Sequence, residues 1–275
     1  MEQSKKRKIL SVILFIAAGI TVFLCISGVI VFLLARSIYN KTHRPEYHVG
    51  DTITLGKYEQ DGFINKKENI EWIVVSVEED RILVVSKYAL DAIPYNLGYE
   101  DVTWETSYIR KWLNENIYKR AFSIKEKNRI LPVTLHNPDN PYDQAEGGND
   151  TVDYVFCLSL EEAEKYFGEY NFYDENEGYG FKQKLMCMPT QHAINNGASS
   201  EIIFTDNFSS VYIPINYTPD AVGVNFASWW LRDPAIDYDY DGACMVDCDG
   251  RVGPNEKIMT IYESNSVRPA MYLKY

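Results

Sequence analysis

An uncharged run near the N-terminus constrains this chain more than any other feature. Residues Ile9 to Ala35 read ILSVILFIAAGITVFLCISGVIVFLLA and include no charged side chain. A helix rises about 1.5 Å per residue, so a run of this length crosses a hydrocarbon core of about 30 Å with some tilt. The absence of any charge argues against a buried helix of a soluble core. The run therefore predicts a membrane-spanning helix over residues 9–35, preceded by a basic tail, residues 1–8.

A cleavable signal peptide is the main alternative for this segment. Such a peptide has an apolar region of only about 7–15 residues, followed by a small-x-small cleavage site. Here the run is longer, and the ARS that follows Leu34 is a poor cleavage site. We therefore expect a signal anchor that stays attached to the rest of the chain.

Basic residues on the two sides of the run predict the orientation of the helix. Four precede it and three follow it more sparsely: Lys5, Lys6, Arg7 and Lys8, then Arg36, Lys41 and Arg44. Lys and Arg are enriched on the cytoplasmic side of spanning helices. The count favours a single-pass protein with a cytoplasmic N-terminus and a C-terminal domain outside the cell.

The remaining chain is acidic and has enough apolar residues to form a core. Residues 37–275 carry 22 Lys+Arg and 38 Asp+Glu, a net charge of −16. Such a domain repels phosphates, which excludes nucleic acid as a partner. A hydrophobic content of 46% with 14% aromatic residues argues against a disordered stalk. We expect a linker over residues 36–48 and one extracellular domain over residues 49–275.

Strand and helix patterns alternate along this domain. GDTITLGKYE and IEWIVVSVEEDRILVVSKYAL read as three strands with a turn at Glu78–Asp80, and the short connections make them antiparallel. Ser159 followed by Glu162 is a capping box that starts a helix. A second helix is predicted by an apolar stripe with helical spacing, Ile109, Trp112, Leu113 and Ile117. The predicted class is α+β, an antiparallel-sheet domain with inserted short helices.

Seven short blocks in a fixed order carry a family resemblance. They are D-x-I-x-L-G at 51–56, I-E-W at 70–72, S-x-I-R-x-W-L-N at 107–114, F-x-L-S-x-x-E-A-E-K-Y-F at 156–167, W-W-L-R-x-P at 229–234, D-G-x-V at 249–252 and V-R-P-A at 267–270. With them the chain resembles a domain-of-unknown-function family found in surface and secreted proteins of Gram-positive bacteria, over about residues 48–275. The W-W-L-R and V-R-P-A blocks are also distantly similar to those of the C-type-lectin-like fold and the sulfatase-modifying-factor proteins. The resemblance implies a lectin-like fold and no particular activity.

The tryptophans and arginines of the last blocks have both structural and ligand-binding interpretations. Trp229 and Trp230 alternate on a strand, so we expect one in the core and the other partly exposed, with Trp230 a candidate to contact a ligand. Arg232 and Arg268 are expected to hold acidic turns through bidentate carboxylate bonds. For both arginines, contact with a ligand is the second interpretation, and Arg232 is the one among the candidate ligand-binding residues.

The segment DYDYDG, residues 237–242, resembles the opening of a calcium-binding loop. Asp237, Asp239 and Asp241 would be ligands at positions one, three and five, and Gly242 would form the turn. The twelfth position of such a loop is a glutamate, whereas here it is Cys248. We therefore favour an exposed acidic hairpin loop that can touch a ligand, with calcium as the alternative. Its candidate ligand-binding residues are Asp237, Tyr238, Asp239, Tyr240 and Asp241.

Catalytic motifs are absent from the sequence. The domain has no G-x-S-x-G, no phosphate-binding loop and no dinucleotide fingerprint, and His136 and His192 have no metal-ligand spacing. The lectin-like resemblance implies one enzymatic alternative, because formylglycine-generating oxidases bind copper through two nearby cysteines. Cys244 and Cys248 occupy that region with three residues between them instead of four.

These observations predict a membrane-anchored domain at the cell surface with a non-catalytic ligand-binding or structural role. The expected partners are the membrane, through the N-terminal helix, and a glycan or protein ligand. No cofactor is expected apart from the calcium alternative. The competing function is a cell-envelope enzyme, a hydrolase or an oxidase related to the formylglycine-generating enzymes, which needs a concave site with converging polar groups.

Overall fold

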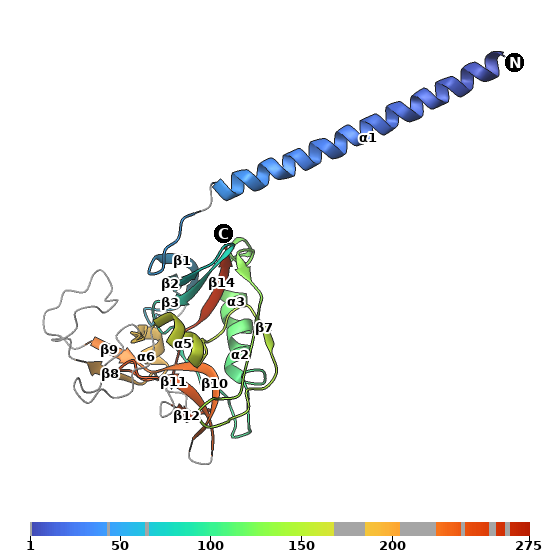
Figure 1. Cartoon of the computed structure of the whole chain (residues 1–275). Coiled ribbons are helices and arrows are strands. Elements are labelled where there is room, and N and C mark those ends of the chain that lie inside the picture. The colour runs from blue at the N-terminus through green and yellow to red at the C-terminus, as the bar shows by residue number, and fades with distance from the viewer. Residues whose placement is uncertain are drawn as a thin grey trace. The chain divides into compact units, whose positions relative to one another are not determined.

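A computed structural model describes residues 2–42, 45–63, 66–167, 185–203, 224–237, 240–252, 257–261 and 265–275. The chain forms two compact units, Met1–Glu46 and Tyr47–Tyr275 (Figure 1). Each unit is considered by itself.

The first unit is the single helix α1, Glu2–Thr42. It extends beyond the predicted span of residues 9–35 at both ends, and it includes residues 36–42 of the predicted linker. Its segment Ala18–Arg36 is long and apolar enough to cross a membrane, by length and composition. Large apolar side chains on it are exposed, among them Phe23 at 69% and Val31 at 64%. Such a surface is stable only when lipid or protein covers it.

The second unit begins with the predicted antiparallel meander. Strands β1 (Thr52–Tyr58), β2 (Glu68–Val77) and β3 (Arg81–Ser86) pair in sequence, and the turn at Glu78–Asp80 joins β2 to β3. The C-terminal strand β14 (Ala270–Lys274) pairs with β3, and β5 (Ile130–Leu131) pairs with β14. The first sheet therefore has the order β1-β2-β3-β14-β5 and is antiparallel throughout.

A second five-stranded sheet has the order β12-β11-β10-β13-β4. Its strands are β10 (Trp229–Asp237), β11 (Tyr240–Val246), β12 (Lys257–Met259), β13 (Ser266–Val267) and β4 (Asp91–Ala92). Pairing is antiparallel except between β10 and β13, which are parallel. The chain passes from the first sheet to the second between β3 and β4, returns for β5, passes back to the second sheet before β10 and returns again between β13 and β14. These crossings join the sheets into one fold, which is α+β and mainly antiparallel, as predicted.

The predicted helical stripe after β4 is confirmed. Helix α2 (Tyr108–Trp112) begins at the cap Ser107, whose side chain accepts the Arg110 N–H. One wide π-helical turn, η1 (Leu113–Ile117), follows, and then α3 (Tyr118–Ala121) and α4 (Ile124–Lys127). All four stripe residues are buried, since the side of the helix that they share packs on the core: Ile109, Trp112, Leu113 and Ile117.

The remaining elements are short. Strands β6 (Val133–Leu135) and β7 (Thr151–Asp153) form one two-stranded sheet, and β8 (Ser200–Ile203) and β9 (Val224–Ala227) form another. Helix α5 (Leu160–Phe167) starts at the predicted capping box, in which Ser159 and Glu162 each accept the other's backbone N–H. Helix α6 (Gln191–Asn195) begins at the cap Thr190.

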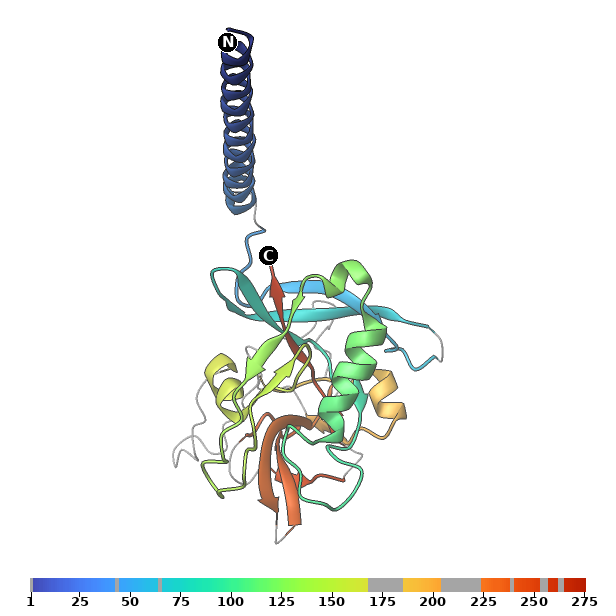
Figure 2. The same cartoon turned by 90° about the vertical axis from the view of Figure 1, so that its right-hand side faces the viewer.

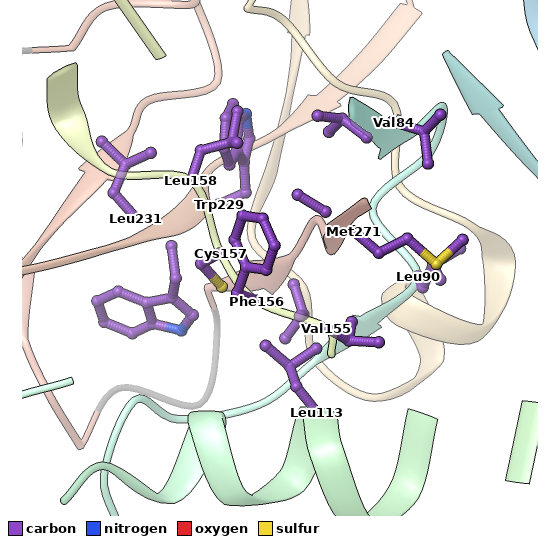
Figure 3. Packing of buried hydrophobic residues seen from close by; sticks show 14 of the residues in the cluster. Val84, Leu90, Leu113, Val155, Phe156, Cys157, Leu158, Trp229, Leu231 and Met271 are labelled. Atoms are coloured by element: carbon purple, nitrogen blue, oxygen red, sulfur yellow. The ribbon is translucent and has the colours of Figure 1, made fainter. Parts of the chain in front are cut away.

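The core lies where the two sheets and the segment after β7 meet. Figure 3 shows Phe156, Cys157 and Leu158 between side chains of both sheets and of the helix that starts at Tyr108. Phe156 pairs with Ala270 through two backbone hydrogen bonds of 3.0 and 2.7 Å, so this segment is tied to β14. One continuous core therefore supports every element near the candidate sites described below.

Candidate functional site

Both tryptophans of the W-W-L-R block are fully buried. The Trp229 indole N–H donates to the Leu185 carbonyl at 3.1 Å, and the Trp230 indole N–H donates to the Ile93 carbonyl at 2.8 Å. The expectation that one ring is partly exposed is therefore wrong. Strand β10 lies in the middle of its sheet, and the fold covers both of its faces. Trp230 exposes no surface to a ligand.

Arg232 holds together the segments around α5 by a buried ion pair. Its guanidinium pairs with Glu162 and donates to the Cys157 carbonyl at 3.3 Å. The neighbouring carboxylate, Asp233, is buried and accepts the Leu160 N–H at 2.7 Å. Burial raises the pKa of Asp233, and the charge of Arg232 opposes that rise. These contacts agree with the structural interpretation of Arg232. Its carboxylate partner, Glu162, however, belongs to the capping box of α5 and not to an acidic turn.

Arg268 is also buried, but it contacts no carboxylate within the residues that the structure describes. Its Nε donates to the Ser86 carbonyl at 3.1 Å, and one Nη donates to the Leu185 carbonyl at 3.2 Å. The guanidinium also lies 5.0 Å from the centre of the Trp229 ring. The expectation of a bidentate carboxylate bond is wrong for this residue, because carbonyl oxygens and aromatic faces satisfy it instead.

The described residues of the DYDYDG segment belong to two paired antiparallel strands, β10 and β11. Asp237 ends β10 and Tyr240 begins β11, and these two residues are paired, as are Ile236 and Asp241. This differs from the loop between two helices that binds calcium in an EF-hand. Tyr238 and Asp239 lie outside the described residues, so the exposed-loop and calcium predictions remain predictions. Among the residues that are described, no three His, Cys, Asp or Glu side chains cluster as metal ligands.

Both late cysteines are buried. The Cys244 thiol is 2% exposed and lies 3.3 Å from Nδ2 of Asn140, while Cys248 is 6% exposed. Neither thiol lines any of the three cavities described below.

The largest of these cavities, of about 740 Å³, is a groove that the sequence did not predict. It lies between residues 105–119, which include α2, η1 and the start of α3, the loop at 96–100 and the end of strand β7 with Tyr154. Its walls carry the half-buried rings of Tyr108, Tyr118 and Tyr154 and the exposed apolar side chains of Leu97 and Val152. A groove with aromatic and apolar walls is the common form of a ligand site.

The polar floor of this groove is a network centred on Asp153, which is 2% exposed. The Arg110 Nε donates to both carboxylate oxygens, at 2.8 and 3.0 Å. The same carboxylate accepts the Trp104 indole N–H at 3.0 Å and the Thr151 hydroxyl at 2.7 Å. Four side chains, with Asn114 as the fourth at 3.2 Å, therefore fix the position of this charge before any ligand arrives.

Asn114 links the π-helical turn to the chain after β7. Its Oδ1 accepts the N–H groups of Tyr154 at 3.0 Å and Val155 at 3.3 Å, and its Nδ2 donates to the Val155 carbonyl at 3.0 Å. The Asn114 side-chain amide thus makes the hydrogen bonds to the backbone at 154–155 that a neighbouring strand would otherwise make. It also sets the distance between the helix and Tyr154, which faces Tyr118 with ring centres 4.2 Å apart and planes 10° apart.

A second cavity, of about 540 Å³, borders α5 and holds three carboxylates, Glu161, Glu162 and Asp233. Two of them are engaged, because Glu162 pairs with Arg232 and Asp233 accepts the Leu160 N–H. His136 also lines this cavity and pairs with Asp150 at 2.8 Å. A third cavity, of about 510 Å³, is lined by polar residues of β1, β2 and the start of α6.

A buried carboxylate at Asp91 brings together residues that sequence spacing did not associate. It accepts the Tyr58 hydroxyl, the Asn196 amide at 2.7 Å and the Ala92 N–H at 2.8 Å, and His192 Nε2 lies 3.4 Å away. Burial, and then the charge of Asp91, raise the pKa of Tyr58, so this phenol remains a neutral donor. The cluster fixes α6 to β1 and β4 and presents no nucleophile.

Comparison with known families gives one match. Residues 79–275 match the family described as a domain of unknown function, DUF6273. No curated protein and no solved structure matches the chain. The matched span begins in the turn before β3, whereas the structural unit begins at Tyr47 and the sequence resemblance was expected from about residue 48.

Proposed function

The chain belongs to the DUF6273 family of domains of unknown function, and we propose that it is a single-pass membrane protein whose domain binds a glycan outside the cell. The observation that carries this proposal is the groove beside α2 and η1.

The anchor is supported by the exposed apolar surface of α1. Its Ala18–Arg36 segment meets the length and composition that a span requires, and lipid would cover side chains such as Phe23 and Val31. The four basic residues before the span support a cytoplasmic N-terminus. An acidic domain on the other side of the membrane then faces the cell envelope.

A glycan suits the groove because the groove combines flat aromatic walls with a fixed polar floor. A sugar ring has one face of C–H groups, which packs on an aromatic ring, and an edge of hydroxyl groups, which needs hydrogen-bond partners. Tyr118 and Tyr154 supply stacked rings, and the side chains around Asp153 supply a rigid polar surface. Rigid tyrosine surfaces lose little conformational entropy on binding.

We further propose that the domain has a C-type-lectin-like fold and belongs to Gram-positive surface proteins. The support is the pair of mainly antiparallel sheets connected through β3–β4 and β13–β14, together with the W-W-L-R-x-P and V-R-P-A blocks.

A second candidate function is a cell-envelope hydrolase at the cavity beside α5. The observation that favours it is the raised pKa of Asp233 next to Glu162, which Arg232 pairs with. Two carboxyl groups in such different environments form the usual acid–base arrangement of glycosidases. Hydrolysis of envelope glycans that disappears in Asp233→Asn, while glycan binding is retained, would favour this function over simple binding.

A glycan array probed with the full chain in detergent micelles tests the main proposal. We expect binding that weakens about tenfold in Tyr118→Ala or Tyr154→Ala, as for a central aromatic contact. Phe63→Ala is the matched control, because Phe63 is 69% exposed and does not line the groove. Equal weakening in all three variants, or no glycan bound by the wild type, would reject the groove as a glycan site.

A further inference from the structure

Residues 119–129, KRAFSIKEKNR, form a basic segment in an acidic domain. The segment has five cationic side chains and one carboxylate, Glu126, whereas residues 37–275 carry a net charge of −16. The five cations lie on or beside α3 and α4: Lys119, Arg120, Lys125, Lys127 and Arg129. We call this segment the 119–129 surface.

The one carboxylate of this surface is engaged by backbone groups. Glu126 accepts the Gly56 N–H at 2.9 Å and the Ser123 N–H at 2.7 Å. None of the five cations forms a salt bridge with another described residue, and Lys119, Arg120 and Lys125 are exposed. The segment therefore keeps a local excess of positive charge.

An apolar side chain stands in the middle of these cations. Ile124 is the first residue of α4 and is 81% exposed, more than any other large apolar residue that the structure describes in this domain. A single exposed isoleucine is ordinary on a protein surface. An isoleucine flanked by lysines on exposed helix ends instead resembles segments that lie in a membrane interface. In such segments the apolar side chain lies below the lipid headgroups, and the cationic side chains lie among the headgroups.

The 119–129 surface lies at the end of the domain where the chain from the anchor enters. Arg129 donates to the Tyr47 hydroxyl at 3.2 Å, and the Tyr47 ring stacks on Tyr275 with centres 5.7 Å apart. The Lys274 N–H also donates to the Arg129 carbonyl at 2.9 Å. Figure 2 shows β1, the C-terminus and the turn after α3 at one end of the domain.

The length of the chain limits how far this end can lie from a membrane that α1 spans. Tyr47 follows the end of the apolar segment, Arg36, by eleven residues. Even a fully extended chain of this length reaches at most about 40 Å. The residues up to Thr42 are helical, so each of them spans less length than an extended residue. Such a tether gives the surface a high effective concentration at the bilayer, so weak contacts are sufficient.

We propose that the 119–129 surface docks on anionic phospholipid headgroups of the membrane that anchors the chain, with Ile124 inserted beneath them. The inference rests on the proposed membrane anchor and is tested without any glycan, because Lys119 also lines the groove. The net negative charge of the domain does not prevent docking, because electrostatic attraction and repulsion at a membrane surface fall off over about 8 Å at physiological salt. The local cations therefore decide the sign of the interaction. Docking orients the domain relative to the bilayer.

The test uses the full chain in lipid nanodiscs, either of phosphatidylcholine alone or with phosphatidylglycerol added. Ile124→Cys, in a Cys25→Ala background, carries an environment-sensitive fluorophore. We expect a blue shift and quenching by lipid-attached nitroxides in the anionic discs, and loss of both in Lys119→Gln/Lys125→Gln or at high salt. Ile236→Cys is the matched control, because Ile236 is also exposed, at 45%, and lies on β10. Its fluorophore is expected to be insensitive to lipid charge.

Two results would overturn the proposal, and they separate it from the anchor. If the chain enters both kinds of disc and the Ile124 fluorophore has the same emission in each, docking is refuted and the anchor stands. If the chain enters neither kind of disc, the anchor is refuted and docking with it. An intrinsic tryptophan spectrum equal to that of the wild type establishes that the glutamine variants are folded.

Discussion

Replacement of Asp153 by alanine tests whether the floor of the groove is also a structural centre. Asp153 lies at the end of β7 and is 2% exposed. Its carboxylate receives hydrogen bonds from side chains of four different positions, Arg110, Trp104, Thr151 and Asn114. The alanine variant leaves all of these donors without that acceptor.

The expected loss of stability follows from two of those donors. Trp104 is fully buried, and an unsatisfied buried donor costs about 1–3 kcal/mol. Arg110 is 25% exposed, so water compensates part of its lost ion pair. Breaking a buried pair by removing one partner costs about 3–5 kcal/mol. We expect the variant to lose about 3–5 kcal/mol of stability in total. Water around the partly exposed Arg110 reduces the cost of the lost ion pair, and this reduction offsets the added cost of the unsatisfied donors.

Urea unfolding of the full chain in detergent micelles, followed by tryptophan fluorescence, measures this loss. With a slope of about 3 kcal/mol per molar urea, the midpoint should fall by about 1–2 M. Asp150→Ala is the control, because Asp150 is 54% exposed and its pair with His136 is worth at most about 1 kcal/mol. If Asp153→Ala shifts the midpoint no more than Asp150→Ala, the network does not stabilise the fold and our reasoning is wrong.

Four further outcomes are expected. Burial raises the pKa of Asp233, so its contribution to stability is complete below its ordinary pKa of about 3.9 and is lost as pH rises through the raised value. Above about pH 4, the free energy of unfolding of Asp233→Asn should therefore rise relative to that of the wild type. A difference between the two proteins that does not change with pH would contradict this. Gly56→Ala should lower the melting temperature more than Gly197→Ala, since both glycines have positive φ but only at Gly56 would the new Cβ meet a ring, that of Phe122, at 2.5 Å; an equal loss would remove the steric argument. Trp230→Ala should cost about 3–5 kcal/mol in the same urea assay, and a cost below about 1 kcal/mol would show that the ring is not part of a packed core. Protease added to intact cells should degrade residues beyond about 45 and spare the N-terminal tail, as the basic flank predicts, and a protected C-terminus would reverse the orientation.

Local patterns predicted the elements that local chemistry determines. The apolar stripe from Ile109 to Ile117 predicted a helix, and the helical turns there bury all of its members. Ser159 and Glu162 predicted a helix start, and they form the capping box. Hydrogen bonds and periodicity within about one helical turn depend on neighbours in the sequence, so a single sequence is sufficient to predict them.

Pairings between distant segments could not be predicted in the same way. The parallel pair of β10 and β13 is set by Trp229 opposite Ser266, and no local pattern distinguishes it from an antiparallel pair. The wide helical turn that places Asn114 against Tyr154 also has no sequence signal that we recognise. The groove depends on this turn and on its contact with the distant residues 152–154, which is why its tyrosines were not among the predicted site residues.

The tryptophan pair shows how a correct local rule can give a wrong functional interpretation. Alternation does send the rings of Trp229 and Trp230 to opposite faces of β10. Exposure depends on what lies against each face, however, and that is decided elsewhere in the chain. Arg268 lies over the Trp229 ring, and Tyr95 packs on the Trp230 ring with centres 5.6 Å apart. Both faces are therefore core.

The blocks that carry the family resemblance contact one another, and this indicates what they encode. Arg232 of one block pairs with Glu162 of another, and Arg268 of a third lies over Trp229. A further block supplies three structural contacts. Ser107 caps a helix, Arg110 binds Asp153, and Asn114 holds the chain at 154–155. Other members of these blocks are core residues. The blocks therefore specify a scaffold, and a ligand cannot be inferred from them. For the proposed glycan site, specificity would come from groove residues outside the blocks, such as Tyr118 and Tyr154, or at a variable position within a block, such as Tyr108, because these side chains make none of the contacts between blocks described above.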